Sequence, residues 1–428
     1  MRAVAYLRIV CPPQSGILPI PSRLHLGLGM LLVAAFFSAI PVTAQEDKPA
    51  KEPYATINRD AVDYRGPGRD PAHDLPGPEI KIGMIVPLQG PCQAEGDVLV
   101  QAARMAIEDE AASPLPAGRR LALVPRDQSG PWGRASNRIV ELVLEDRALA
   151  VFTSTSGIMA HLAEQVGNRL GVPVLTISSD AGTTQTNVPW IFRLGPDDTT
   201  QAGAFARDIY AERHFKRVLL VTEDDRDGRL GTEAFVKAAR QCGGRAPDEV
   251  QINSTRPETQ PVAAQLDAVS PQAVVIWASS DLGAKMVEEI RNAKPTVPIY
   301  LCQKATAVIA APRSVDDRRE DKAVREPHST APSGGVWMVV SRQAEGTDAK
   351  RAFTRRYRER TGNPPSIAAM QAYDAVRVIA AALRQSGPNR ARLRDRLAQM
   401  KNFPGESGVI SFDRAGNDLA AVTLARLR

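Results

Sequence analysis

Short apolar runs recur along the chain and alternate with segments in which apolar residues repeat at helical spacing. The apolar runs are Ile80–Pro87, Leu121–Pro125, Ala148–Thr153, Val172–Ser178, Val218–Thr222, Ala273–Ala278, Val297–Leu301 and Gly335–Val340. The segments with helical spacing are Ser136–Glu145, Gly157–Leu170, Gln201–Glu212, Thr232–Gln241 and Leu282–Asn292. This alternation predicts βαβ units, and therefore parallel sheets with helices on both faces.

The apolar runs are continuous, which is typical of strands that are buried on both sides. About ten strands are too many for one doubly wound sheet, and 428 residues exceed the usual size of a single core. We therefore expect an α/β protein with two lobes.

The N-terminal segment has the pattern of an export signal. A basic residue, Arg23, precedes the uncharged apolar stretch Leu26–Ile40, and small residues follow at Val42 and Ala44. This pattern predicts a cleavable signal peptide over residues 1–44 and a periplasmic protein. A buried helix or an uncleaved anchor is the alternative. Residues 45–78 are rich in proline and charge and predict an extended arm, so we expect the folded part to begin at Glu79.

Composition and motifs exclude several classes of function. The chain is 43% hydrophobic and 24% charged, which is typical of a soluble globular protein. A net charge of +6 gives little support for a nucleic-acid partner, and Arg351–Arg360 predicts an amphipathic surface helix. The cysteines that follow the signal form no CxxC motif, no Cys/His cluster predicts a metal site, and buried thiols are the simplest interpretation of Cys92, Cys242 and Cys302.

The sequence also lacks the local signatures of common enzymes. It contains no GxSxG elbow, no HExxH, no Walker loop and no GxGxxG after a strand. We therefore expect no catalytic residue and no cofactor. A periplasmic hydrolase stays a weaker alternative, because a triad can assemble without a local signature.

Hydroxyl-bearing residues follow two successive predicted strands. They are Thr153–Gly157 and Ser178–Thr184, each at the start of a helical segment. In open α/β sheets ligands bind beyond the carboxyl ends of strands, and hydroxyls with free N–H groups suit an anionic group. Capping of the helix by Ser and Thr explains either loop by itself equally well.

The order of these motifs resembles a known family, the type I periplasmic solute-binding proteins, particularly the branched-chain amino acid and amide receptors of ABC importers. The resemblance covers about residues 79–428. It rests on Ile80–Pro91 (IKIGMIVPLQGP), Gly96-Asp97, Ala102–Glu108, Thr153–Gly157 (TSTSG), Gly171–Ser178 (GVPVLTIS), Ile191–Arg193, Asp227-Gly228, Ala273–Ala278, Tyr373–Ala375 and Gly408–Gly416 (GVISFDRAG).

The resemblance implies a type I periplasmic binding protein fold, with two Rossmann-like lobes joined by three hinge crossings. The first lobe would comprise residues 79–196 and 341–405, and the second residues 197–340 and 406–428. The implied protein is a monomeric receptor that closes on a small polar ligand (an amino acid, amide or carboxylic acid) and delivers it to the permease of an ABC importer. An exported sensor for a membrane kinase or chemoreceptor is the alternative function.

The resemblance also implies a ligand site at the strand ends. Ser154, Thr155 and Ser156 match the loop that binds the ligand carboxylate, and Ser178, Ser179, Asp180 and Thr183 match a second carboxylate loop. Glu95 stands at a specificity position. The expected contacts from the second lobe are Asp227, Ser280, Asp281, Gln303 and Lys304.

The orientation of Lys304 determines which ligand charge we expect the site to accept. The acid that pairs with a ligand ammonium in amino-acid receptors falls here near Gln303 or Lys304. If Lys304 faces the cleft unpaired, its charge disfavours a cationic ligand. If it points to solvent, that preference disappears.

Overall fold

The first lobe is built on a five-stranded parallel sheet with the order β2-β1-β3-β4-β5. The computed structural model describes residues 64–113, 115–186, 188–256, 258, 260–309, 334–341 and 348–427. The strands are β1 (Glu79–Val86), β2 (Arg120–Asp127), β3 (Ala150–Thr153), β4 (Val174–Thr176) and β5 (Ile191–Arg193). The predicted signal peptide lies outside the described residues.

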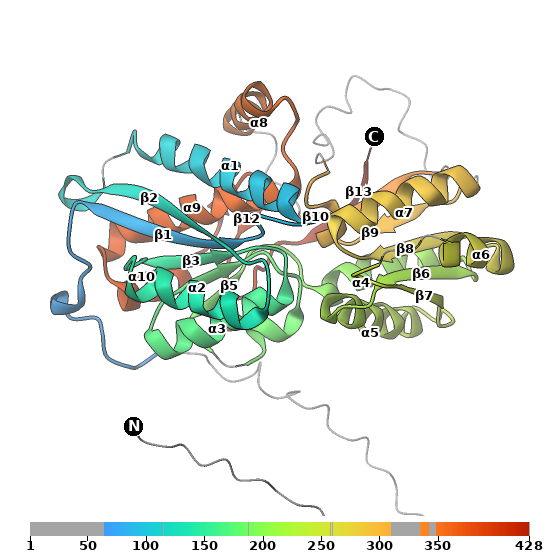
Figure 1. The fold of residues 1–428 in the computed structure, drawn as a ribbon, viewed down its shortest axis with the longest axis horizontal. Helices are drawn as coiled ribbons and strands as arrows, with labels where there is room; N and C mark the ends of the chain where they lie inside the picture. The colour runs from blue at the N-terminus through green and yellow to red at the C-terminus, as the bar shows by residue number, and fades with distance from the viewer. Residues whose placement is uncertain are drawn as a thin grey trace, which may run out of the picture. The chain divides into compact units, whose positions relative to one another are not determined.

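Helices cover both faces of this sheet, α1 on one side and α2 and α3 on the other (Figure 1). The helices of this lobe are α1 (Gln93–Glu110), α2 (Trp132–Leu144), α3 (Gly157–Leu170), α9 (Ile367–Ser386) and α10 (Arg390–Ala398). Successive residues of β1 explain the layering: Ile82 and Met84 enter one core with α1 and α9, whereas Ile85 enters another with α2 and α3. A strand that is buried on both faces has few polar positions, which is why the sequence of β1 is a nearly continuous apolar run.

The second lobe is built on a six-stranded sheet with the order β13-β10-β9-β8-β6-β7. Its strands are β6 (Val218–Glu223), β7 (Asp248–Ile252), β8 (Ala273–Trp277), β9 (Ile299–Leu301), β10 (Val336–Ser341) and β13 (Val422–Leu427). Only β13 pairs antiparallel, with β10. The helices are α4 (Asp198–Ala206), which continues into η5 (Arg207–Glu212), then α5 (Arg226–Gln241), α6 (Gln260–Val269), α7 (Ser280–Ala293) and η6 (Lys304–Thr306).

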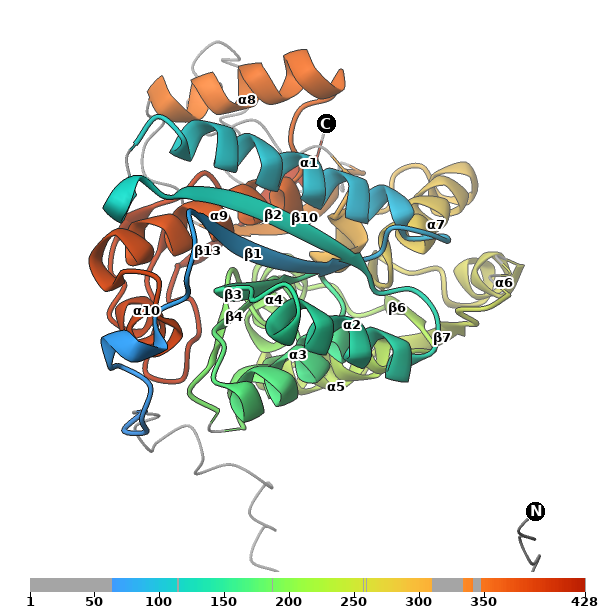
Figure 2. The ribbon, with the colours of Figure 1, turned by 60° about the vertical axis from the view of Figure 1, so that its left-hand side comes forward.

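The chain returns to the first lobe after β10 and leaves it again before β13. Helix α8 (Asp348–Thr361) lies along α1 (Figure 2), and its Phe353 and Tyr357 are buried, as their spacing predicts. A two-stranded ribbon, β11 (Phe403–Pro404) with β12 (Val409–Ile410), follows α10. Phe412 packs on Phe192 of β5 with ring centroids 5.2 Å apart. Ile410 and Phe412 of this segment belong to the first core.

The second half of the expected arm is anchored to the first lobe. Residues 64–78 contain a short turn of helix, η2 (Pro71–His73), and lie against α10. The Nε of Arg69 lies 2.6 Å from Asp395, and Arg392 Nη2 lies 2.7 Å from Asp74. Charged residues of the expected extended arm therefore form ion pairs with α10.

Among the described residues, no helix has both the length and the apolar character needed to cross a membrane. The short helices η3 (Pro116–Gly118) and η4 (Ala181–Thr184) connect elements of the first lobe.

Candidate functional site

The two lobes meet where the carboxyl ends of their parallel strands face each other. From the first lobe come the loops after β3 and β4, which lead into α3 and η4. From the second lobe come the loops after β6, β8 and β9, which lead into α5, α7 and η6. Hydrogen bonds between the start of α3 and the start of α5 join the two sets of loops. This is the position at which open α/β sheets hold their ligands.

Two hydroxyls of the loop after β3, those of Ser154 and Ser156, form hydrogen bonds within the protein. Ser156 is the N-cap of α3 and accepts a hydrogen bond from the backbone N of Met159 at 3.4 Å. The Ser154 hydroxyl donates to Oε1 of Gln128 at 2.7 Å and accepts from the backbone N of Ser156 at 3.3 Å. Capping, the alternative interpretation of this loop, is therefore present alongside any binding role.

Glu95 supports this loop from α1. Its Oε1 accepts hydrogen bonds from the backbone N of Thr155 at 3.0 Å and from the Thr155 hydroxyl at 2.8 Å. The side chain is buried, and burial raises the pKa of Glu95 against the lowering effect of these two bonds. Glu95 thus positions Thr155.

The loop after β4 is connected to the hinge and to the second lobe. The Ser178 hydroxyl accepts from the backbone N of Asp180 at 3.2 Å, and the Thr183 hydroxyl donates to the carbonyl of Asp180 at 2.8 Å. The carbonyl of Ser179 accepts from the backbone N of Asp198, the first residue of α4, at 2.8 Å. The loop is therefore held rigidly between the two lobes.

Asp180 is the centre of a charged cluster that crosses between the lobes. Its Oδ2 lies 2.9 Å from Nε2 of His161 in α3 and 3.0 Å from Nε of Arg226 at the start of α5. The pKa of His161 is raised to about 9, most strongly by its hydrogen bond to Asp180 and next by its hydrogen bond to Glu164. Burial by itself would raise the pKa of Asp180, but the bond and charge of His161 and the charge of Arg226 together lower it. With His161 protonated, its Nε2 donates to Asp180.

A second cluster connects the lobes through Asp227. The backbone N of Gly157, at the start of α3, donates to both carboxylate oxygens of Asp227, at 3.2 and 3.3 Å. Lys304 Nζ lies 2.8 Å from Asp227 Oδ2 and 2.7 Å from Asp225 Oδ2. Burial would lower the pKa of Lys304, but Asp227 and Asp225 raise it well above the ordinary value. The lysine is thus half-buried and doubly paired, which is neither of the two arrangements expected from the sequence.

Gly157 is required at this contact. A Cβ at this position would lie 2.4 Å from Oδ1 of Asp227 and 3.0 Å from Oδ2 of Asp180. Two carboxylates therefore approach the start of α3 within a space that only glycine leaves open. Both are favourably placed for the positive end of the helix dipole.

The other residues expected from the second lobe lie around this cluster. Ser280 is buried at the start of α7, whereas Asp281 forms an exposed ion pair with Lys285 at 2.6 Å. Gln303 faces the hinge, where its amide lies close to Gly195. Its backbone N donates to Gln201 Oε1 at 2.8 Å, and its Nε2 is buried without a hydrogen-bond partner in the part of the chain that the structure describes.

Sequence reasoning missed four charged residues of this interface. Asp225 and Arg226 directly precede Asp227, and His161 lies four residues after Gly157, one helical turn into α3. The fourth, Asp198, is buried at the start of α4 and accepts from Nε1 of Trp277 at 3.2 Å. Burial raises the pKa of Asp198 well above its usual value. The proximity of His161 and Arg226 to strand ends was visible in the sequence, but their pairing across the lobes was not.

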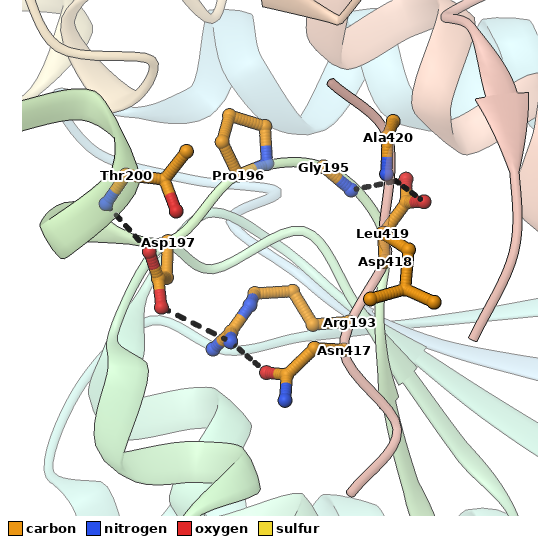
Figure 3. A pocket seen from close by; sticks show the side chains of 9 residues that line it. All are labelled: Arg193, Gly195, Pro196, Asp197, Thr200, Asn417, Asp418, Leu419 and Ala420. Carbon is orange, nitrogen blue, oxygen red and sulfur yellow. Dashed lines mark hydrogen bonds and ion pairs between the residues drawn. The ribbon is translucent and has the colours of Figure 1, made fainter. Parts of the chain in front are cut away.

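A cavity of about 210 Å³ lies at the hinge (Figure 3). Figure 3 shows Arg193 between Asp197 and Asn417, with Gly195 donating to Asp418. The cavity is lined by residues of two chain crossings, 193–200 and 417–420.

Within the described ranges there is no cluster of His, Cys, Asp and Glu that could hold a metal ion. Cys92, Cys242 and Cys302 are free thiols in the structure. Burial raises the pKa of Cys302 to about 12, so this thiol is uncharged at neutral pH.

The protein has two α/β lobes whose strand ends face each other, and the chain crosses between the lobes at a hinge. This arrangement defines a two-lobed binding-protein fold. The model of the family described as periplasmic binding protein matches residues 79–424, and the chain belongs to this family. The family consists of solute-binding receptors and is not an enzyme class. No protein of curated function matches the chain.

Solved structures show the same fold at low identity. A leucine-binding protein of Thermotoga maritima is 20% identical, with a TM-score of 0.68 over 82% of this chain and 95% of that one. A branched-chain amino acid binding protein of Streptococcus pneumoniae, in complex with isoleucine, is 20% identical with a TM-score of 0.67 over 82% and 100%. An ABC transporter solute-binding protein of Rhodopseudomonas palustris, in complex with 3,4-dihydroxybenzoic acid, is 17% identical with a TM-score of 0.69 over 82% and 94%. The fold is therefore the type I periplasmic binding protein fold.

Proposed function

We propose that this protein is a periplasmic receptor that captures a small polar organic ligand between its lobes and delivers it to an ABC importer permease. The observation that carries the proposal is the bond between the start of α3 and Asp227: the first lobe already holds a carboxylate there, through a backbone N–H. Donors that hold one carboxylate are suited to a ligand with a carboxylate or amide end. The ligands for which the structural neighbours are named or with which they were solved, leucine, isoleucine and 3,4-dihydroxybenzoic acid, are all carboxylic acids.

The proposed site consists of two hydroxyl-bearing loops of the first lobe and a set of polar residues of the second lobe. The loops are Ser154–Ser156 and Ser178–Thr183, and the polar residues are Asp227, Ser280, Asp281, Gln303 and Lys304. Glu95 supports the first loop. Because a ligand shifts the balance between open and closed lobes only through differential affinity, the contacts from the second lobe are those that drive closure.

The paired state of Lys304 changes the expected ligand chemistry. Its ammonium is neutralised by Asp225 and Asp227, so it supplies no free positive charge that would repel a ligand amine. An α-amino acid is therefore as compatible with the site as a simple carboxylic acid.

The receptor role rests on further proposals about the whole chain. We propose that residues 1–44 are removed on export, that the mature protein is a monomer, and that it needs no cofactor and carries no catalytic residue. We also propose the division into a first lobe of residues 79–196 and 341 to about 412, and a second lobe from residues 197–340 and the C-terminal strand. The packing of α9 against α1 and the pairing of β13 with β10 support this division.

A thermal-shift screen of amino acids, amides, and aliphatic and aromatic acids tests the proposed site. The melting temperature of the wild-type protein should rise with at least one ligand, and Ser154→Ala plus Ser156→Ala should abolish the rise. Ser156 caps α3, so its loss also costs about 1 kcal/mol of stability. Ser366→Ala is the matched control, because Ser366 caps α9 within the first lobe and should lose stability without losing the ligand shift.

Retention of the full ligand shift in the double variant would contradict the site. Uptake of the same labelled ligand by cells with and without the gene then separates transport from sensing. A receptor that serves an importer makes uptake depend on the gene, whereas a sensor does not.

A further inference from the structure

The contact between Asp227 and Gly157 has a consequence for which ligands the site accepts; this inference rests on the proposed function. Asp227 belongs to α5 of the second lobe, and Gly157 opens α3 of the first. The side chain of Asp227 is only 11% exposed, and both its oxygens approach one backbone N–H. The protein thus places a carboxylate of its own on the donor that a ligand carboxylate would use.

We propose that Asp227 is the specificity-determining residue of the site and that it acts as a built-in competitor for carboxylate ligands. One backbone N–H cannot serve two carboxylates at full strength. A ligand carboxylate that binds at the start of α3 must therefore displace Asp227 from Gly157. It also approaches a second negative charge at close range, so its affinity is reduced relative to that of a neutral analogue.

The geometry distinguishes Asp227 from the other carboxylates nearby. Asp225 shares Lys304 with Asp227, but its Oδ1 caps α5 by accepting from the backbone N of Gly228 at 2.7 Å, so it is engaged within its own lobe. Asp180 accepts from the backbone N of Gly182 at 2.8 Å and belongs to the first lobe. Only Asp227 bonds the Gly157 N–H from the opposite lobe.

Lys304 makes the competition effective. Its side chain is 13% exposed, and its ammonium lies 2.8 Å from Asp227 and pairs with this carboxylate beside the start of α3. Ion pairs and bonds to charged acceptors are stronger than neutral hydrogen bonds, so a ligand carboxylate gains little by exchanging with Asp227. A neutral ligand does not meet the like-charge repulsion, since it brings no second anion to the cluster.

The test compares acids with their amides on two variants. Asp227→Ala removes the competing carboxylate. Asp225→Asn removes the other carboxylate that pairs with Lys304, but it leaves an N-cap residue at the start of α5 and leaves the bond between Asp227 and Gly157. The probes are benzoate with benzamide and L-leucine with L-leucinamide, measured by titration calorimetry near pH 7. We expect Asp227→Ala to bind at least one of the two acids tenfold or more tightly than the wild type. The affinity for the matching amide should change less than threefold, and Asp225→Asn should change the acid affinity less than threefold.

Two results would overturn the inference. Acid affinity that is equal or lower in Asp227→Ala, including the absence of acid binding, would show that Asp227 does not compete with carboxylates. An equal gain in acid affinity in Asp225→Asn would show that net charge alone controls binding. The proposed function fails separately, when no solute of the screen binds the wild type or either variant. Unchanged circular dichroism spectra show that each variant is folded.

Discussion

The hinge and the facing strand ends both contain buried charges, but these charges are held in different ways. At the hinge, the Arg193 guanidinium is 2% exposed and bonds the carbonyl of Asp180 at 2.9 Å and the Thr184 hydroxyl at 3.0 Å. It also bonds the side chain of Asn417, in the last crossing between lobes. At the strand ends, Arg226 reaches Asp180 across the lobes while 40% of its side chain remains exposed.

The partners explain the difference. Every bond of Arg193 goes to the first lobe or to a hinge segment, where chain connectivity keeps the groups together whether the lobes are open or closed. The bonds of Arg226 and Asp227 to Asp180 and Gly157 exist only while the lobes are in contact. Hinge charges therefore contribute to folding, whereas interface charges contribute to the balance between open and closed lobes.

The largest effect should follow from Arg193→Ala. Removing the guanidinium leaves the buried oxygens of Asp180, Thr184 and Asn417 without this donor, and breaking a buried charge network from one side costs about 3–5 kcal/mol. In urea unfolding, the midpoint concentration of urea should fall in proportion to this loss of free energy. The dependence of the free energy of unfolding on urea concentration should stay unchanged.

Arg138→Ala is the control for this substitution. Arg138 pairs with Glu141 on α2 at 3.0 Å, and the two side chains are 45% and 32% exposed, so its loss should cost less than about 0.5 kcal/mol. The hinge interpretation fails if Arg193→Ala loses no more stability than this surface variant.

The second effect is a pH dependence that arises at His161. Its hydrogen bonds to Asp180 and Glu164 raise its pKa from 6.5 to about 9, so the folded state binds the proton more tightly than the unfolded state. The stabilisation is fully present below pH 6.5, declines as the pH rises through this window, and is lost above about pH 9. It should amount to about 2 kcal/mol once solvent screening of a partly exposed group is allowed for.

Urea unfolding of the wild type between pH 6 and pH 9.5 measures this dependence. His161→Gln should have a flatter profile over the same range, because glutamine keeps polar contacts without titrating. Equal slopes for the two proteins would assign the pH dependence to other groups.

Much of the fold follows from local sequence. Ala273–Ala278 is apolar at every position, and Ile80–Pro87 is apolar at every position but Lys81, because both faces of the corresponding strands, β8 and β1, are covered. Phe353 and Tyr357 are four residues apart, and this spacing alone predicts the buried stripe of α8. The matched family and the structural neighbours confirm the two-lobed α/β class.

The site could be predicted only in part. Strand ends are local features, so the loops at Ser154 and Ser178 could be located from the sequence. The partners of Lys304 and Arg226 could not, because they depend on which side chains of two distant lobes meet. The ion pairs of residues 64–78, which the sequence predicts to be part of an extended arm, could not be predicted for the same reason, since Asp395 lies more than 300 residues from Arg69.

The smallest effect on unfolding should come from Arg226→Ala. This substitution tests whether a charge at the interface between the lobes contributes to closure rather than to folding. Because 40% of the Arg226 side chain is exposed, its pair with Asp180 should contribute less than about 1 kcal/mol to the free energy of unfolding. The same substitution removes one of the charged contacts that close the lobes, so small-angle X-ray scattering should show a larger radius of gyration than for the wild type. Arg229→Ala is the matched control, because Arg229 lies on the same helix and, among the residues that the structure describes, bonds only the carbonyl of Asp224 in its own lobe. An increase that also appears in Arg229→Ala, or a loss of unfolding free energy as large as that of Arg193→Ala, would show that the interface charges serve folding rather than closure.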